Sequence, residues 1–109
     1  MFCDFEHLYF TSNGYVVYCK NCGCYQIAFN TTLLTLTEKD FFVLCKMALN
    51  KYAAIDYILD DDTKSIIIET PAAGMCLILS AKEAAELCYM LEEADTEIKA
   101  LALIKMFNA

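Results

Sequence analysis

The order of hydrophobic and polar positions divides the chain into short strand-like runs and two strongly periodic helical stretches. Apolar runs flank Asn13-Gly14, a pair that suits a tight turn, so we expect a β-hairpin over about residues 7 to 19. The runs "YQIAF" and "LLTLT" predict two further strands, and the second leads into "TEKDFFVLCKMALNKY". That stretch carries apolar residues at helical spacing, with Thr37 as the expected N-cap.

A second passage repeats this order of strands and helix. "AAIDYIL", "SIIIET" and "MCLILS" predict three strands, and "SAKEAAELCYMLEEA" predicts a helix opened by a Ser80/Glu83 capping box. At a constant offset, "LTLTEKDFFVLCKM" and "LILSAKEAAELCYM" have six identical positions. Units that run from strand into helix share such patterns by chance, so two readings stay open: an internal β-β-α duplication over about residues 15–52 and 55–94, or a chance likeness.

The last segment, "DTEIKALALIKMFNA", predicts a separate C-terminal helix. One of its faces carries Ala100, Leu103, Ile104 and Phe107, and Leu101 and Met106 lie off that face. A terminal helix that is apolar on more than one side has to sit deep in its own domain or meet another chain, and a small domain offers little depth. We therefore expect a protein partner for this helix, either a second copy in a homodimer or another protein.

These elements predict an α+β fold with short antiparallel strands, two strand-into-helix units and a C-terminal helix. A chain of 109 residues fits a single domain over residues 1–109, and its 59% hydrophobic content is enough for a core without cross-links. No apolar run is long enough to span a bilayer, and the acidic start "MFCDFEHLYF" lacks the basic residues of a signal peptide. We expect a soluble protein of the cytoplasm.

The charge balance excludes classes of partner. The net charge is −7, and only eight Lys and Arg are scattered along the chain. Nucleic-acid affinity depends on basic groups that neutralise phosphates, and anionic lipids repel an acidic protein. We expect no nucleic-acid partner and no membrane partner.

Cysteine is the residue type that could carry chemistry. The count of seven is odd and no export signal is present, so reduced thiols are expected rather than a disulfide framework. Cys19 and Cys22 have the spacing of half a zinc site, and the glycine after them relieves crowding in a tight turn. A complete zinc site would add Cys3 and His7, with Cys24 as a substitute ligand.

The geometry expected of the first hairpin permits this ligand set. A regular turn at Asn13-Gly14 places Leu8 opposite Cys19, which brings the start of the chain near the cysteine turn. Two alternatives stay open. Cys19 and Cys22 could be a redox dithiol, although Lys20 is the only adjacent cation and no helix begins there to lower a thiol pKa, or they could be small hydrophobic residues in a packed turn.

Other catalytic groups are scarce. Cys45, Cys76 and Cys88 lie in apolar patterns and are interpreted as core residues. His7 is the only histidine, and neither a Gly-x-Ser-x-Gly turn nor a glycine-rich phosphate loop occurs. The sequence therefore favours a non-enzymatic protein-interaction module, stabilised at one end by a zinc knuckle if the cysteines bind metal. The alternative is a thiol-dependent or metal-dependent redox enzyme or sensor that uses Cys19 and Cys22.

"YCKNCGCYQIAFNTTLLTLTEKDF", followed by "IIIETPAAGMCLILSAKEAAELCYMLEEAD", resembles a family of small bacterial proteins known only as a domain of unknown function. The shared features are an early cysteine, a Cys-x-x-Cys before an aromatic-Gln-hydrophobic run, and a Pro-containing turn before a Leu-rich strand and helix. Here they correspond to Cys3, Cys19, Cys22, "YQIAF" and "TPAAGMCLIL". The family pattern has Gly at the position of Asn30, and Asn also tolerates positive φ. The resemblance implies that these three cysteines act together, and it implies no activity.

Overall fold

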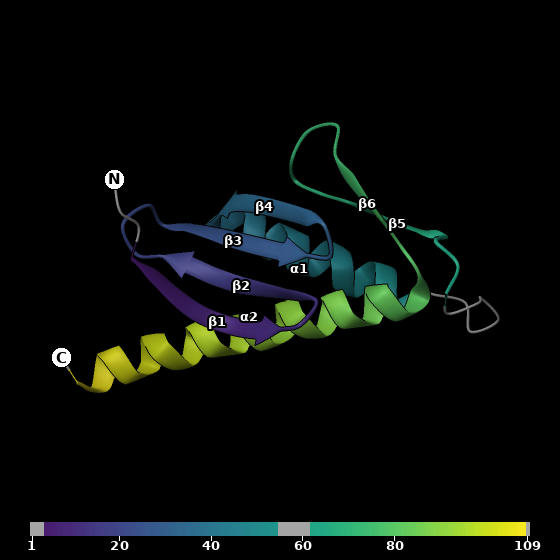
Figure 1. The fold of residues 1–109 in the computed structure, drawn as a ribbon. Helices are drawn as coiled ribbons and strands as arrows, with labels where there is room; N and C mark the ends of the chain where they lie inside the picture. The colour runs from purple at the N-terminus through teal and green to yellow at the C-terminus, as the bar shows by residue number, and fades with distance from the viewer. Residues whose placement is uncertain (1–3, 55–61, 109) are drawn as a thin grey trace.

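The computed structural model describes residues 4–54 and 62–108 of the chain. Its elements are, in order, β1 (Phe5–Thr11), β2 (Gly14–Cys19), β3 (Cys24–Phe29), β4 (Thr32–Thr37), α1 (Glu38–Ala53), β5 (Ile66–Glu69), β6 (Cys76–Leu79) and α2 (Ala81–Phe107). Strands β1 to β4 form one antiparallel sheet in chain order, and β5 and β6 pair in a second sheet (Figure 1). Both helices pack against the inner face of the larger sheet, so the predicted α+β class is confirmed.

The core fills the space between the inner sheet face and the two helices. Alternate strand positions point inward, as a half-buried sheet requires. The ring of Tyr25 stacks on that of Phe41 at 4.1 Å between centroids. Helix α1 places Phe41 there because its N-cap is Thr37, whose side chain accepts the Asp40 amide at 3.2 Å. The predicted N-cap of α1 is confirmed. The core side chains include Val16, Tyr25, Ile27, Leu34, Leu36, Phe41, Leu44, Ile68, Leu77, Leu87 and Leu91.

The first hairpin forms, but the predicted turn and register are wrong. The loop is Ser12-Asn13, Gly14 opens β2, and a bulge lies between His7 and Tyr9. The glycine is required by the neighbouring strand: a Cβ on Gly14 would lie 2.2 Å from the carbonyl oxygen of Ala28 in β3. The displaced turn and the bulge put Phe5 opposite Cys19, where the sequence predicted Leu8.

The other turns match their expected chemistry. Asn30, expected to tolerate positive φ, has a φ of 54° and closes the turn between β3 and β4. The capping box of α2 is confirmed, because the Glu83 amide donates to the Ser80 hydroxyl at 3.2 Å and the Ser80 amide donates to the Glu83 carboxylate at 2.9 Å. The Asn30 side chain also donates to Glu83 at 2.7 Å, which ties this turn to the start of α2.

The two predicted C-terminal helices are a single helix, which corrects the predicted break near residue 95. Helix α2 runs without interruption for 27 residues, about 40 Å at 1.5 Å per residue. Its middle contains neither Gly nor Pro, and the Lys99 ammonium pairs with the Asp95 carboxylate at 2.8 Å just after the predicted boundary. This helix elongates the molecule to 50 × 29 × 25 Å, and its yellow C-terminal end reaches past the sheet in Figure 1.

The second strand-into-helix unit is described in part. The predicted strand "AAIDYIL" starts wrongly, because Ala53 is the last residue of α1 and Ala54 is its C-cap. The rest of that run lies outside the described residues. Thr37 and Ser80 occupy matching places as N-caps that follow a strand, and the internal duplication stays a prediction.

Candidate functional site

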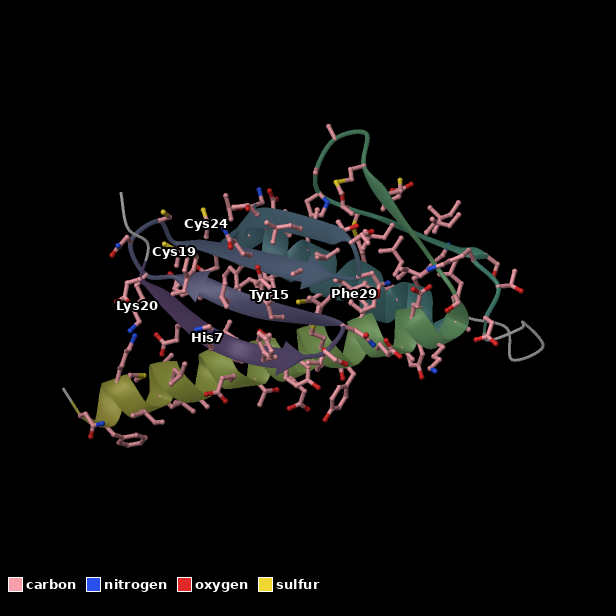
Figure 2. The ribbon with its side chains drawn as sticks, in the orientation of Figure 1. His7, Tyr15, Cys19, Lys20, Cys24 and Phe29 are labelled. Atoms are coloured by element: carbon pink, nitrogen blue, oxygen red, sulfur yellow. The ribbon has the colours of Figure 1, made fainter. Side chains whose placement is uncertain are left out.

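The cysteine turn joins β2 to β3 at one end of the larger sheet, where Figure 2 labels Cys19 and Cys24. These two residues face each other in register across the hairpin. The Cys22 amide donates to the Cys19 sulfur at 3.4 Å, and the Gly23 amide donates to the Cys19 carbonyl at 2.9 Å. Gly23 has a φ of 72°, so the turn uses glycine for its conformational freedom as expected.

The structure brings only part of the predicted ligand set to this turn. Cys19 is buried, Cys22 is exposed and Cys24 is half-buried, with its thiol 3.8 Å from the carbonyl oxygen of Cys22. His7 is exposed on β1 and pairs with Val17. Because Phe5 pairs with Cys19, His7 lies two residues further along the same outer face of the sheet.

Cys3 lies outside the described residues. Within residues 4–54 and 62–108, no three His, Cys, Asp or Glu side chains are grouped closely enough to hold a metal ion. Zinc binding at this turn therefore stays a prediction.

The cation beside the cysteine turn is already paired with carboxylates. The Lys20 ammonium lies 3.1 Å from the Glu6 carboxylate and 3.9 Å from that of Asp4. The hydrogen bond to Glu6, with the charges of Glu6 and Asp4, raises the pKa of Lys20. A lysine that carboxylates neutralise stabilises a neighbouring thiolate less, and this environment does not favour redox chemistry.

The remaining cysteines differ in their burial. Cys88 is buried and Cys45 packs against the core, as expected, whereas Cys76 is exposed, so its assignment to the core is wrong. In β6 the alternation turns Leu77 and Leu79 inward and leaves Cys76 outside. Burial first, and then the nearby Asp95 charge, raises the pKa of Cys45 to about 12, and burial also raises that of Cys88. Thiols with raised pKa values stay protonated and are weak nucleophiles.

The outer face of the larger sheet carries a shallow hollow of about 250 Å³. Phe5, His7, Phe10, Tyr15, Val17 and Gln26 line it. The rings of Phe10 and Tyr15 stack at 6.1 Å, and Phe10 remains 72% exposed. This surface has one imidazole and one amide among apolar groups, and no acid/base pair converges on it.

The C-terminal end of α2 is the most exposed apolar part of the described chain. Leu103 and Ile104 are 55% and 54% exposed, and Met106 and Phe107 are 74% and 87% exposed. Leu101, predicted to lie off the apolar face, packs against the core instead. The predicted face therefore points away from the protein's own core.

A groove between α1 and α2, about 550 Å³ in volume, was not found from the sequence. Lys39, Phe42, Val43, Cys45, Lys46, Leu49, Leu91, Glu92 and Asp95 line it. One oxygen of Asp95, Oδ1, is buried and has no hydrogen-bond partner among the described residues. In the sequence, Phe42 and Val43 lie outside the helical spacing of apolar residues that predicted α1. Their apolar side chains were the available signal for a second apolar surface on this helix.

Comparison with known proteins gives a family and no relative of known activity. Neither the curated proteins nor the solved structures contain a match to the chain. Within the described residues, no helix combines the length and apolar character needed to cross a bilayer. A family of unknown function, DUF6686, matches residues 1–108. The match covers nearly the whole sequence, and the chain belongs to the DUF6686 family.

Proposed function

We propose that this chain is a non-enzymatic protein-interaction module that binds another protein through the C-terminal end of α2. The supporting observation is the exposure of that end, where four large apolar side chains follow one another within five residues, from Leu103 to Phe107. Water-facing apolar groups scattered singly are ordinary, but a contiguous cluster marks an interaction surface. We refer to Leu103, Ile104, Met106 and Phe107 together as the α2 end.

A protein surface suits the α2 end better than a lipid surface. The chain carries a net charge of −7, and anionic headgroups repel it.

An enzymatic role lacks support for a separate reason. The thiols of Cys45 and Cys88 have raised pKa values, and His7 lies exposed on a strand, without an acid/base partner among the described residues.

Cross-linking in the cells that produce the protein naturally tests the proposal. Lys99 precedes the α2 end and Lys105 lies within it, and an amine-reactive cross-linker should join them to a second polypeptide more often than it joins Lys64, before β5. A Leu103→Ser/Phe107→Ser variant should lose these links. An Ile67→Ser/Ile78→Ser variant should keep them, because it changes two exposed apolar residues on the β5–β6 hairpin, away from the α2 end. Links from Lys99 and Lys105 that stay within one polypeptide in the unmodified protein would refute the proposal.

As a second candidate, we propose that the cysteine turn holds a structural zinc ion that fixes this end of the sheet. The Cys22 amide donor to the Cys19 sulfur and the positive φ of Gly23 support it, because backbone N–H groups aimed at a thiolate stabilise a metal ligand. Cys19 and Cys22 would supply two ligands. His7, Cys24 and Cys3 are the remaining donors, in the set expected from the sequence.

A further inference from the structure

We propose that the protein bound by the α2 end is a second copy of this chain, and that the α2 end of each copy fills the α1–α2 groove of the other. This inference rests on the proposed function and names its partner. The arrangement is isologous: one twofold axis relates two identical contacts, each made of one groove and one α2 end.

The groove has the chemistry that an apolar helix end requires. Its walls are mainly apolar, and Phe42 and Leu49 are 39% and 45% exposed. These side chains sit beside Leu91, which is buried at 1% exposure and continues the apolar surface into the groove. An amphipathic helix laid into such a groove buries side chains from both partners.

The carboxylate of Asp95, on the wall of the groove, is only partly satisfied by the described residues. Asp95 Oδ2 accepts the Lys99 ammonium at 2.8 Å, whereas Oδ1 is inaccessible to solvent and has no hydrogen-bond partner in the described chain. The chain itself covers Oδ1, but the Asp95 side chain is 26% exposed, so a partner's cation can reach the carboxylate from the accessible side and strengthen its charge-assisted contacts. The partner that fills the groove should therefore carry a basic group beside its apolar residues.

The second copy of α2 presents such a group at the matching position. Glu92, Asp95, Lys99, Leu103 and Met106 follow one side of the helix at spacings of three and four residues. If two α2 helices pack antiparallel about a twofold axis near residue 97, Lys99 of one copy lies opposite Asp95 of the other. Leu103 then lies opposite Leu91, which lines the partner groove, and Met106 lies about one helical turn beyond it.

The charge distribution along α2 favours the antiparallel arrangement. Residues 81–97 contain six carboxylates and one lysine, a net charge of −5, whereas residues 98–107 contain two lysines and no acid, a net charge of +2. Antiparallel packing places the basic half of each helix beside the acidic half of the other. Parallel packing would put like charges together, which is unfavourable.

The available area suits a stable dimer. At about 200 Å² for a fully exposed large side chain, the α2 end with Phe42 and Leu49 exposes roughly 700 Å² in each copy. A symmetric pair would bury roughly 1,400 Å², which lies within the usual range for specific protein interfaces.

Two charge variants of the full chain test the contact between Asp95 and Lys99 of different copies. Asp95→Lys places two lysines at each side of the axis, and Lys99→Asp places two aspartates there. Each variant alone should dimerise roughly 30-fold or more weakly than the unmodified chain, as expected for a broken buried charge pair. An equimolar mixture should form the heterodimer, detected by its mass in native mass spectrometry, although both internal Asp95–Lys99 pairs are lost. Glu97→Lys, on the side of α2 away from the groove, should leave the dimer intact.

A second variant covers the case in which a charge variant fails to fold. Leu49→Ser lines the groove and is 45% exposed, so it should lose the dimer while unfolding at nearly the same temperature. Dimers that survive both Asp95→Lys and Leu49→Ser, or a mixture that forms no heterodimer, would overturn the inference. In that case links from Lys99 and Lys105 to another polypeptide would leave the proposed function standing. Only cross-links confined to single polypeptides would refute both.

Discussion

Replacing Glu83 by glutamine removes a charge that joins three segments of the fold. Its Oε1 accepts the Ser80 amide at 2.9 Å and pairs with the Lys64 ammonium, and its Oε2 accepts the Asn30 side chain at 2.7 Å. The carboxylate therefore caps α2, anchors the segment before β5 and fixes the turn between β3 and β4. Hydrogen bonding, first to Lys64 and then to the Ser80 amide, lowers the pKa of Glu83 from 4.5 to about 2.

The magnitude follows from these contacts. A carboxylate at a helix N-terminus contributes about 0.3–1 kcal/mol, and the pair with Lys64, whose side chain is 54% exposed, contributes less than about 1 kcal/mol. Glutamine can still accept the Ser80 amide but weakens the charge-assisted bonds. We expect Glu83→Gln to lower the free energy of unfolding by about 1–2 kcal/mol at neutral pH.

The stabilisation that the Glu83 charge contributes depends on pH. Because the folded-state pKa is below the unfolded value, the charge stabilises the fold fully above pH 4.5, and this contribution is lost as the pH falls from 4.5 towards about 2. Urea unfolding of the unmodified chain and the variant should give a difference that shrinks over that range. Glu97→Gln, an exposed acid in the same helix, serves as the control and should change little. An equal difference at neutral and acidic pH would refute the role of the charge.

Two other predictions concern the opposite ends of β2, which begins at Gly14 and ends at Cys19. Gly14→Ala should destabilise the fold by roughly 2 kcal/mol or more, because the new Cβ meets the Ala28 carbonyl oxygen at 2.2 Å; calorimetry should show a fall of several degrees, and an unchanged melting temperature would contradict the close approach. Metal analysis of native protein, purified without a metal-affinity tag, should find zinc near one ion per chain, lost together with thermal stability in Cys22→Ser. Protein that contains no metal and has the stability of the variant would exclude the zinc candidate.

Local signals in the sequence predicted the ends of the elements well. Thr37 and Ser80 were assigned as N-caps because capping depends on residues within one helical turn, and both bond as expected. The positive φ of Asn30 agrees with what the family resemblance implied, because Asn tolerates that conformation. The α+β class followed from these elements and their periodicities.

Contacts between distant segments caused the errors. Gly14 was assigned to the turn, but β3 packs so close to it that only glycine fits at the start of β2, and this shifted the register of the hairpin. The face of α2 that carries Leu103 and Phe107 was correctly identified as apolar. Whether it turns inward or outward depends on where Ile98 and Leu101 meet the core, which helical periodicity alone does not specify.

The candidate sites were predictable to different degrees. The spacing of Cys19 and Cys22 identified the turn, but the positions of the other ligands depend on strand register, and Cys3 lies outside the described residues. The apolar character of the C-terminal helix was predictable from its residues, and a partner for it stays a proposal. The groove with Phe42 and Asp95 became visible only when α1 and α2 were placed side by side.

Sedimentation equilibrium of the unmodified full chain, over a wide range of concentrations, tests the central claim most directly. The account predicts a molar mass that rises with concentration to twice the chain mass of 12.3 kDa and no further, because the two contacts close on each other. A mass that stays at 12.3 kDa at every concentration would contradict the pairing of two α2 helices.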